Sequence, residues 1–207
     1  METPPYLKEF ITLVTLHGLV LISPGSNFAL VAKNSLTQPR KYGLLTAFGI
    51  ALGTAVYVGL ALFFFSSLLA LTKSRYLFLG LKYAGALYLV YLGVKSLFAS
   101  RPVGDLKTAS TISTSEAVRN GLFNQLGNYK ATLFFMSLFT QVVDFHTPLF
   151  IKLGYGVWMF FATFAWFGLV TYLLSKTGIR ERLREYLHWI NRAFGLLLVL
   201  LGVALVL

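Results

Sequence analysis

The stretch LISPGSNF at residues 21–28 interrupts the first hydrophobic segment of the chain. Apolar sequence continues on both sides, but the middle of the stretch holds a proline, a glycine and three small polar residues. Proline removes a backbone donor and clashes with the preceding turn, and glycine adds conformational freedom. The stretch therefore predicts a kinked or broken helix. In a bilayer, such a break is tolerated only where the freed backbone groups face protein or a watery cavity.

A second weak stretch, QLGNYK at residues 125–130, interrupts a later hydrophobic segment. A glycine stands at the same distance before the helix-breaking residue of each stretch: Gly18 is six residues before Pro24, and Gly121 is six residues before Gly127. Paired interruptions in corresponding halves of a membrane protein are the sequence feature that best indicates a transporter's binding site.

The composition is that of an integral membrane protein. Of 207 residues, 57% are hydrophobic and 12% are charged, about half the charged fraction of a soluble domain, and the mean hydropathy is +0.71. The net charge of +11 comes from short loops between apolar runs, so we expect attraction to the lipid bilayer and no nucleic-acid partner. The chain has no cysteine, which excludes disulfides and thiolate metal sites, and we expect no metal or cofactor.

Six segments are long and apolar enough to cross a bilayer as helices. We predict one all-α transmembrane domain over residues 1–207, with six transmembrane helices in two inverted three-helix repeats. The first repeat covers 1–99, a polar linker covers 100–115, and the second repeat covers 116–207. Since each repeat has an odd number of spans, the second is inverted in the membrane. The predicted spans are 7–32, 42–71, 76–98, 117–143, 148–175 and 187–207.

Basic residues in the loops predict the orientation. Loops after the odd-numbered spans and their flanks hold twelve Lys and Arg residues, and the other side holds five. The positive-inside rule then puts the odd loops in the cytoplasm and both termini outside it. The twelve are Lys33, Arg40, Lys41, Lys95, Arg101, Lys107, Arg119, Lys176, Arg180, Arg182, Arg184 and Arg192; the five are Lys8, Lys73, Arg75, Lys82 and Lys152.

Two pairs of small residues stand at helix-packing spacing: Gly49 with Gly53, and Gly80 with Ala84. Such pairs let helix backbones approach closely in lipid. We interpret them as close packing within the bundle, and a face for a homodimer is the alternative.

The motifs SPGSN at residues 23–27 and NYKA at 128–131 resemble those of the LysE/RhtB family of bacterial amino-acid exporters. The family has proline where this chain has Ser26 and Tyr129. The resemblance implies a multi-pass secondary transporter of the bacterial inner membrane, not an enzyme, that exports amino acids or close derivatives by proton antiport. Further similarity to the family lies at residues 30–36, 43–50, 82–89, 93–97 and 190–195.

A helix broken at 24–25 exposes N–H groups on one side, which attract a carboxylate, and carbonyls on the other, which attract an ammonium group. The alternative is a kinked helix whose polar groups satisfy one another. Lys130 lies inside a span, where lysine is costly. It either binds a substrate carboxylate, or becomes neutral and takes part in proton transfer. The alternative is that it snorkels toward a headgroup or caps carbonyls of the broken helix. The predicted substrate-binding residues are Ser23, Pro24, Gly25, Ser26, Asn27, Asn128, Tyr129 and Lys130.

His17 stands two turns before Pro24 in the first span. Histidine titrates near neutral pH, so His17 is the candidate for proton coupling, and a hydrogen-bonded structural histidine is the alternative. No acidic residue lies deep in a span, which leaves a passive channel for small polar solutes as the main rival function. An intramembrane enzyme is a weaker rival, because the chain has no H-E-x-x-H motif and no paired deep aspartates.

Overall fold

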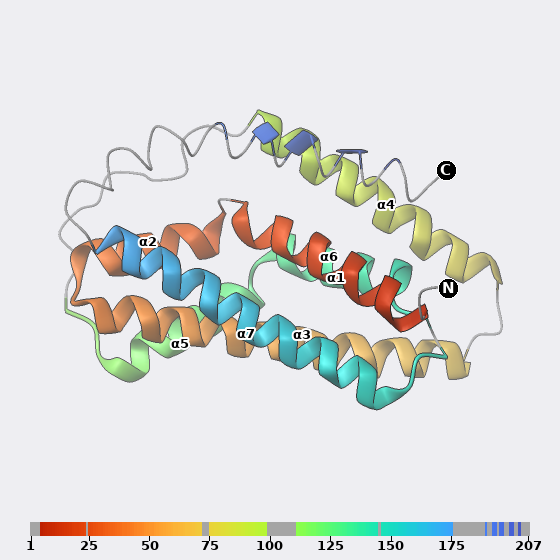
Figure 1. The fold of residues 1–207 in the computed structure, drawn as a ribbon, viewed down its shortest axis with the longest axis horizontal. Helices are drawn as coiled ribbons and strands as arrows, with labels where there is room; N and C mark the ends of the chain where they lie inside the picture. Colours follow the sequence, from red (N-terminus) through yellow and green to blue (C-terminus); the bar gives the residue numbers. More distant parts are fainter. Residues whose placement is uncertain are drawn as a thin grey trace.

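The computed structural model describes residues 5–23, 25–71, 75–98, 111–144 and 146–175, together with residues 189, 192, 193, 195, 196, 199, 200 and 203. All regular secondary structure in the continuous ranges is helical, as predicted. The helices are α1 (Pro5–Ile22), α2 (Ser26–Thr37), α3 (Arg40–Leu71), α4 (Arg75–Leu97), α5 (Thr114–Leu126), α6 (Tyr129–Gln141) and α7 (Leu149–Leu174) (Figure 1).

Two of these helices contain segments long and apolar enough to cross a membrane, Arg40–Phe63 in α3 and Leu149–Leu174 in α7. The bent pair of α1 and α2 makes a third candidate span. Each of the first five predicted spans coincides with one helix or with two consecutive helices. Most of the predicted sixth span and most of the linker lie outside the described residues.

The long elements run back and forth between two ends of the molecule (Figure 1). The start of α1, the end of α3 and the start of α7 meet at one end, on the right of the view. The end of α2, the start of α3 and the end of α7 meet at the other. The joint between α1 and α2 and the joint between α5 and α6 therefore lie between the two ends.

Glycines allow α3 and α5 to pack with their backbones close together. An added Cβ at Gly49 would lie 2.1 Å from the carbonyl oxygen of Val118, and one at Gly121 would lie 2.3 Å from that of Thr46. Gly53 packs on the side chain of Gln125 in the same way. The predicted packing role of Gly49 and Gly53 is confirmed.

The corresponding prediction is wrong for Gly80. An added Cβ there would meet no atom of the described residues within 4 Å, and both Gly80 and Ala84 are exposed. Closely packed glycines occur further along α4 instead. An added Cβ at Gly93 would lie 2.6 Å from the carbonyl oxygen of Gly195, and one at Gly195 would lie 2.6 Å from that of Gly93.

Buried apolar side chains form two clusters. The first cluster combines α1, α6 and parts of α3 and α7, with Leu13, Phe134, Phe139 and Met159 among its members. The second cluster combines α2 with the first half of α3 and the second half of α7. Because α3 and α7 run in opposite directions, the first cluster lies toward the end where α7 begins, and the second lies toward the end where it finishes.

Candidate functional site: two facing helix breaks

The first break separates α1 from α2. Helix α1 ends at Ile22 and α2 begins at Ser26, and the two axes differ by 53°. Gly25 is the N-cap of α2 in an extended conformation, and no side chain caps the helix. The first N–H groups of α2 therefore face the break without a side-chain acceptor at the cap. Pro24 itself lies outside the described residues.

The second break separates α5 from α6. Helix α5 ends at Leu126, with Gly127 as its C-cap, and α6 begins at Tyr129. Asn128 caps α6, because its side-chain oxygen accepts a hydrogen bond from the backbone N–H of Lys130 at 3.1 Å. The hydroxyl of Tyr57 on α3 donates to the carbonyl of Leu126 at 2.7 Å, so one carbonyl freed by the break is satisfied.

The two residues that replace family prolines, Ser26 and Tyr129, are the first residues of α2 and α6. Proline is favoured at this position because its missing N–H has no partner within the helix in any case. Both helices begin here without proline at their first position. Ser26 is exposed, and the Tyr129 side chain lies outside the described part.

The two breaks are joined by side-chain hydrogen bonds. Lys130, at the start of α6, donates from Nζ to the Oγ of Ser23, just after α1, at 2.5 Å. Asn27, at the start of α2, donates from Nδ2 to the Oε1 of Gln125, near the end of α5, at 2.6 Å. In each bond a residue that follows one break pairs with a residue that precedes the other.

A chain of amide side chains extends the second of these bonds. Asn124 donates to Asn27 at 2.7 Å, Asn27 donates to Gln125, and Gln125 donates to Thr54 on α3 at 3.0 Å. Each amide in the middle of the chain uses one donor and its oxygen, which fixes its orientation. Gln125 is only 3% exposed, so these bonds satisfy a side chain that would otherwise be costly to bury.

His17 lies in an aromatic environment beside the breaks. Its Nε2 is 3.4 Å from the hydroxyl of Thr163, which itself donates to the carbonyl of Met159 at 2.7 Å. Since the Thr163 proton is used, His17 donates to Thr163, and its Nδ1 is left as an acceptor. That atom is buried with no hydrogen-bond partner among the described residues. The ring packs against Phe134, Phe135 and Trp158.

A cavity of about 40 Å³ lies where the breaks meet. Of the predicted substrate-binding residues, Ser23, Gly25, Asn27, Asn128 and Lys130 line it, and so does His17. Ser26 does not. Pattern reasoning missed three polar lining residues, Thr54, Gln125 and Thr163. Gln125 was detectable in principle, since it opens the second weak stretch, but Thr54 and Thr163 stand in apolar runs without any local signal.

The lining polar groups suit a zwitterion. Lys130 supplies a positive charge and N–H donors, the starts of α2 and α6 add the positive ends of two helix dipoles, and side-chain oxygens supply acceptors. No Asp or Glu of the described residues lines the cavity. Among the described residues, no group of three His, Asp or Glu side chains stands close enough together to hold a metal ion.

Comparison with known proteins gives a family and several relatives. Residues 19–207 match the model of the family described as LysE type translocator. The chain is similar to a protein named threonine efflux protein from Salmonella typhi, with 28% identity over 204 residues that cover 97% of this chain and 98% of that protein. A protein of the same name from Escherichia coli (strain K12) is 27% identical over 207 residues, with the same coverage of both chains.

A protein named leucine efflux protein from Salmonella choleraesuis (strain SC-B67) is 35% identical to the chain over 130 residues. That match covers 62% of this chain and 60% of that protein. No solved structure matches the chain.

Proposed function

Because this chain belongs to the LysE type translocator family, we propose that it exports amino acids or close derivatives across the bacterial inner membrane by proton antiport. The family consists of multi-pass membrane translocators, not of enzymes. Relatives named for threonine and leucine efflux support amino acids as the substrate class. The observation that carries the proposal is the cavity in which both helix breaks meet around Lys130.

The breaks support a zwitterion as ligand. In the proposed complex the substrate carboxylate lies at Lys130 and at the uncapped start of α2, where N–H groups and the positive ends of helix dipoles converge. The substrate ammonium group lies against side-chain oxygens, with Ser23 and Asn27 as candidates. The described lining contains a lysine and no carboxylate, which favours neutral amino acids over lysine or arginine as cargo.

The two apolar clusters support a transporter over a passive channel. The cavity lies between them, and its 40 Å³ has room for about three waters, fewer atoms than threonine or leucine has. Substrate entry therefore requires the elements around the breaks to separate. We propose that they separate toward one side of the membrane at a time, as in alternating access.

Six spans in two inverted repeats belong to the same proposal. A two-fold relation between repeats pairs residue i with j and residue j with i, as in an isologous contact. Two observations support it. Gly93 and Gly195 pack reciprocally and stand 102 positions apart. The bonds across the breaks pair Ser23 with Lys130 and Asn27 with Gln125, where Gln125 follows Ser23 by 102 positions and Lys130 follows Asn27 by 103. The loop charges support termini outside the cytoplasm.

His17 is the proposed proton carrier in the cavity. Its Nδ1 has no hydrogen-bond partner among the described residues, so it can take a proton, at the cost of a buried charge that a substrate carboxylate would offset. His17→Gln keeps a polar side chain that cannot titrate. In proteoliposomes we expect it to retain exchange of labelled for unlabelled substrate and to lose uptake driven by a pH gradient. Thr163→Val, which keeps the imidazole, should retain both; gradient-driven transport by His17→Gln would contradict the assignment.

The function itself is tested with purified protein in proteoliposomes and a panel of labelled amino acids. We expect accumulation of a neutral amino acid against its own gradient when a pH gradient is imposed, and collapse of that accumulation when a protonophore is added. Flux that only equilibrates the substrate, with no response to the protonophore, would indicate a channel. A panel without any transported amino acid would overturn the proposal.

A further inference from the structure

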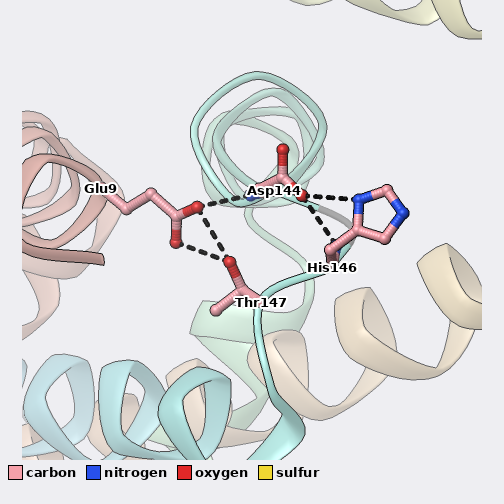
Figure 2. Close-up of polar contacts among 4 residues, drawn as sticks. All are labelled: Glu9, Asp144, His146 and Thr147. Atoms are coloured by element: carbon pink, nitrogen blue, oxygen red, sulfur yellow. Dashed lines mark hydrogen bonds and ion pairs between the residues drawn. The ribbon is translucent and has the colours of Figure 1, made fainter. Parts of the chain in front are cut away.

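Glu9 holds three parts of the chain together at one end of the molecule. Its carboxylate accepts a hydrogen bond from the hydroxyl of Thr147, with 2.9 Å and 3.0 Å to the two oxygens, and one from the backbone N–H of Asp144 at 3.0 Å (Figure 2). The hydroxyl of Tyr155 on α7 donates to Oε2 at 3.0 Å. We call Glu9, Asp144, Thr147 and Tyr155 the outer clamp.

The outer clamp joins α1 to α7 near the end of the molecule where both helices begin (Figure 1). Aromatic side chains fill the space between the clamp and the central cavity. The ring of Phe10 packs against Tyr155 and Trp158 with centroids 5.8 Å and 5.9 Å apart, and Trp158 packs against His17 at 5.9 Å. A substrate that leaves the cavity at this end must therefore part α1 from α7, and the clamp bonds oppose that movement.

We propose that Glu9 is a proton-binding site that keeps this end closed while charged and releases it when protonated. The proposal rests on the proposed function in one respect, since the loop charges assign this end to the outside of the membrane. Protons that drive export would reach Glu9 from outside and open the exit for the substrate. The outer clamp would then supply the carboxylate that coupling needs and that the spans do not contain at depth.

Counting donors and acceptors gives the physical reason. The charged carboxylate accepts from all three donors, and hydrogen bonds to a charged group are about twice as strong as neutral ones. The protonated acid has a single carbonyl oxygen and an O–H group that itself needs an acceptor. Oε1 of the protonated acid can still accept from Thr147 and Asp144, but both bonds lose their charge assistance. Tyr155 keeps an acceptor in the carbonyl of Tyr6 at 3.1 Å. Protonation therefore weakens chiefly the connection between α1 and the segment before α7.

Other ionisable groups lie close to the clamp and are controls for it. Asp144 bonds through its side chain to the backbone N–H of His146 at 2.7 Å and to its ring at 3.2 Å, and both side chains are largely exposed. Lys8 is the neighbour of Glu9 on α1. On α7, Lys152 is buried one turn before Tyr155, on the same side of the helix. His146 is the histidine bonded to Asp144 beside the clamp, so it is the matched alternative to Glu9.

The test measures access to the cavity, not transport. The chain has no cysteine, so Ala131→Cys places a single thiol in the cavity wall without removing a polar group. Right-side-out vesicles are treated with a membrane-impermeant maleimide at outside pH 7.5 and at about pH 4, where carboxylates take up protons. The rates are divided by those of Leu149→Cys, an exposed position at the outer start of α7, to cancel the pH dependence of thiol reactivity.

We expect outside acid to increase the relative labelling rate of Ala131→Cys. Adding Glu9→Gln should raise the rate at pH 7.5 about tenfold or more, as the loss of charge-assisted hydrogen bonds predicts, and should abolish the response to acid. Adding Thr147→Val should raise the rate while the acid response remains. Adding His146→Gln should change neither.

Slow labelling and an intact acid response in the Glu9→Gln background would overturn the proposal, as would loss of the response in the His146→Gln background. If Glu9→Gln does not insert, Tyr155→Phe and Thr147→Val decide the question, because unchanged rates in both would show that the clamp does not control access. A protein that shows this labelling pattern but transports no amino acid would support the proposal for Glu9 and contradict the proposed export function.

Discussion

The ammonium group of Lys130 donates a hydrogen bond to Ser23 at 2.5 Å, across 107 positions of the sequence and between two helix breaks. This bond puts the one basic residue inside the fourth predicted span at the centre of the molecule. A lysine at membrane depth is normally found against a partner or a cavity, and Lys130 has both. Snorkelling to a headgroup, the alternative from sequence, does not describe this position.

Lys130→Met should weaken substrate binding roughly 10- to 100-fold, because the substrate carboxylate would lose a charge-assisted hydrogen bond. Lys130→Arg should restore only part of the affinity, since a planar guanidinium needs more room than the small cavity offers. Equilibrium binding of labelled substrate to purified protein measures both. Ser23→Ala is the matched control, because it removes the hydrogen-bond partner of Lys130 and keeps the charge. Normal substrate affinity of Lys130→Met would show that Lys130 does not bind the substrate.

Two substitutions at Gly25 distinguish the effect of its backbone conformation from the effect of side-chain size in the cavity. Its extended conformation is open to any residue, and an added Cβ would lie 4.0 Å from the Nζ of Lys130, an ordinary contact. Gly25→Ala should therefore transport nearly normally. Gly25→Leu should insert but abolish transport, because the larger side chain fills the cavity beside Lys130. Equal activity of the two variants in proteoliposomes would show that the cavity is not the transport site.

Tyr57→Phe should destabilise the protein by about 1–3 kcal/mol, because the Leu126 carbonyl would lose its donor in a partly buried setting. The Tyr57 hydroxyl also lies 2.6 Å from the hydroxyl of Thr132 on α6. The substitution therefore removes contacts to residues before and after the second break. Unfolding in mixed detergent measures the effect. Tyr91→Phe, at an exposed tyrosine of α4, is the control and should be close to neutral. Equal stability of both variants would contradict this role for Tyr57.

Gly121→Ala tests the contact between α3 and α5. An added methyl group would meet the backbone oxygen of Thr46 at 2.3 Å and the backbone nitrogen of Ile50 at 3.0 Å, and backbone atoms cannot move aside cheaply. We expect a loss of about 1–3 kcal/mol or more and a lower melting temperature in detergent. Gly80→Ala, where the methyl meets no described atom within 4 Å, should keep or raise stability.

The orientation is tested by reporter fusions. If the excess of twelve basic residues over five directs insertion, an enzyme that is active only outside the cytoplasm should work when it is fused after Leu207. The same enzyme fused after Pro102 should be inactive. The reverse pattern would invert the assignment and would also place Glu9 on the cytoplasmic side.

Local pattern predicted most of the helices and both breaks. Apolar runs marked the helical segments, and the stretches at 21–28 and 125–130 marked the points where α1 and α5 end. Both are local effects, since a residue's own backbone limits and its neighbours' polarity decide them. Gly80 shows what spacing leaves open. Its spacing to Ala84 equals that of Gly49 to Gly53, yet within the described part of the chain only Gly49 and Gly53 pack closely on another helix.

The sequence by itself determined a helical membrane protein of the translocator family with two interrupted helices. Only the tertiary structure decided which residues the interruptions bring together. Gln125 meets Asn27 across 98 positions, and Glu9 meets Thr147 across 138. Such pairings depend on how α1, α5 and α7 pack, and packing is set by the shapes of whole helix faces, which no short stretch of sequence records. The cavity, its amide chain and the outer clamp therefore appear only in the folded molecule.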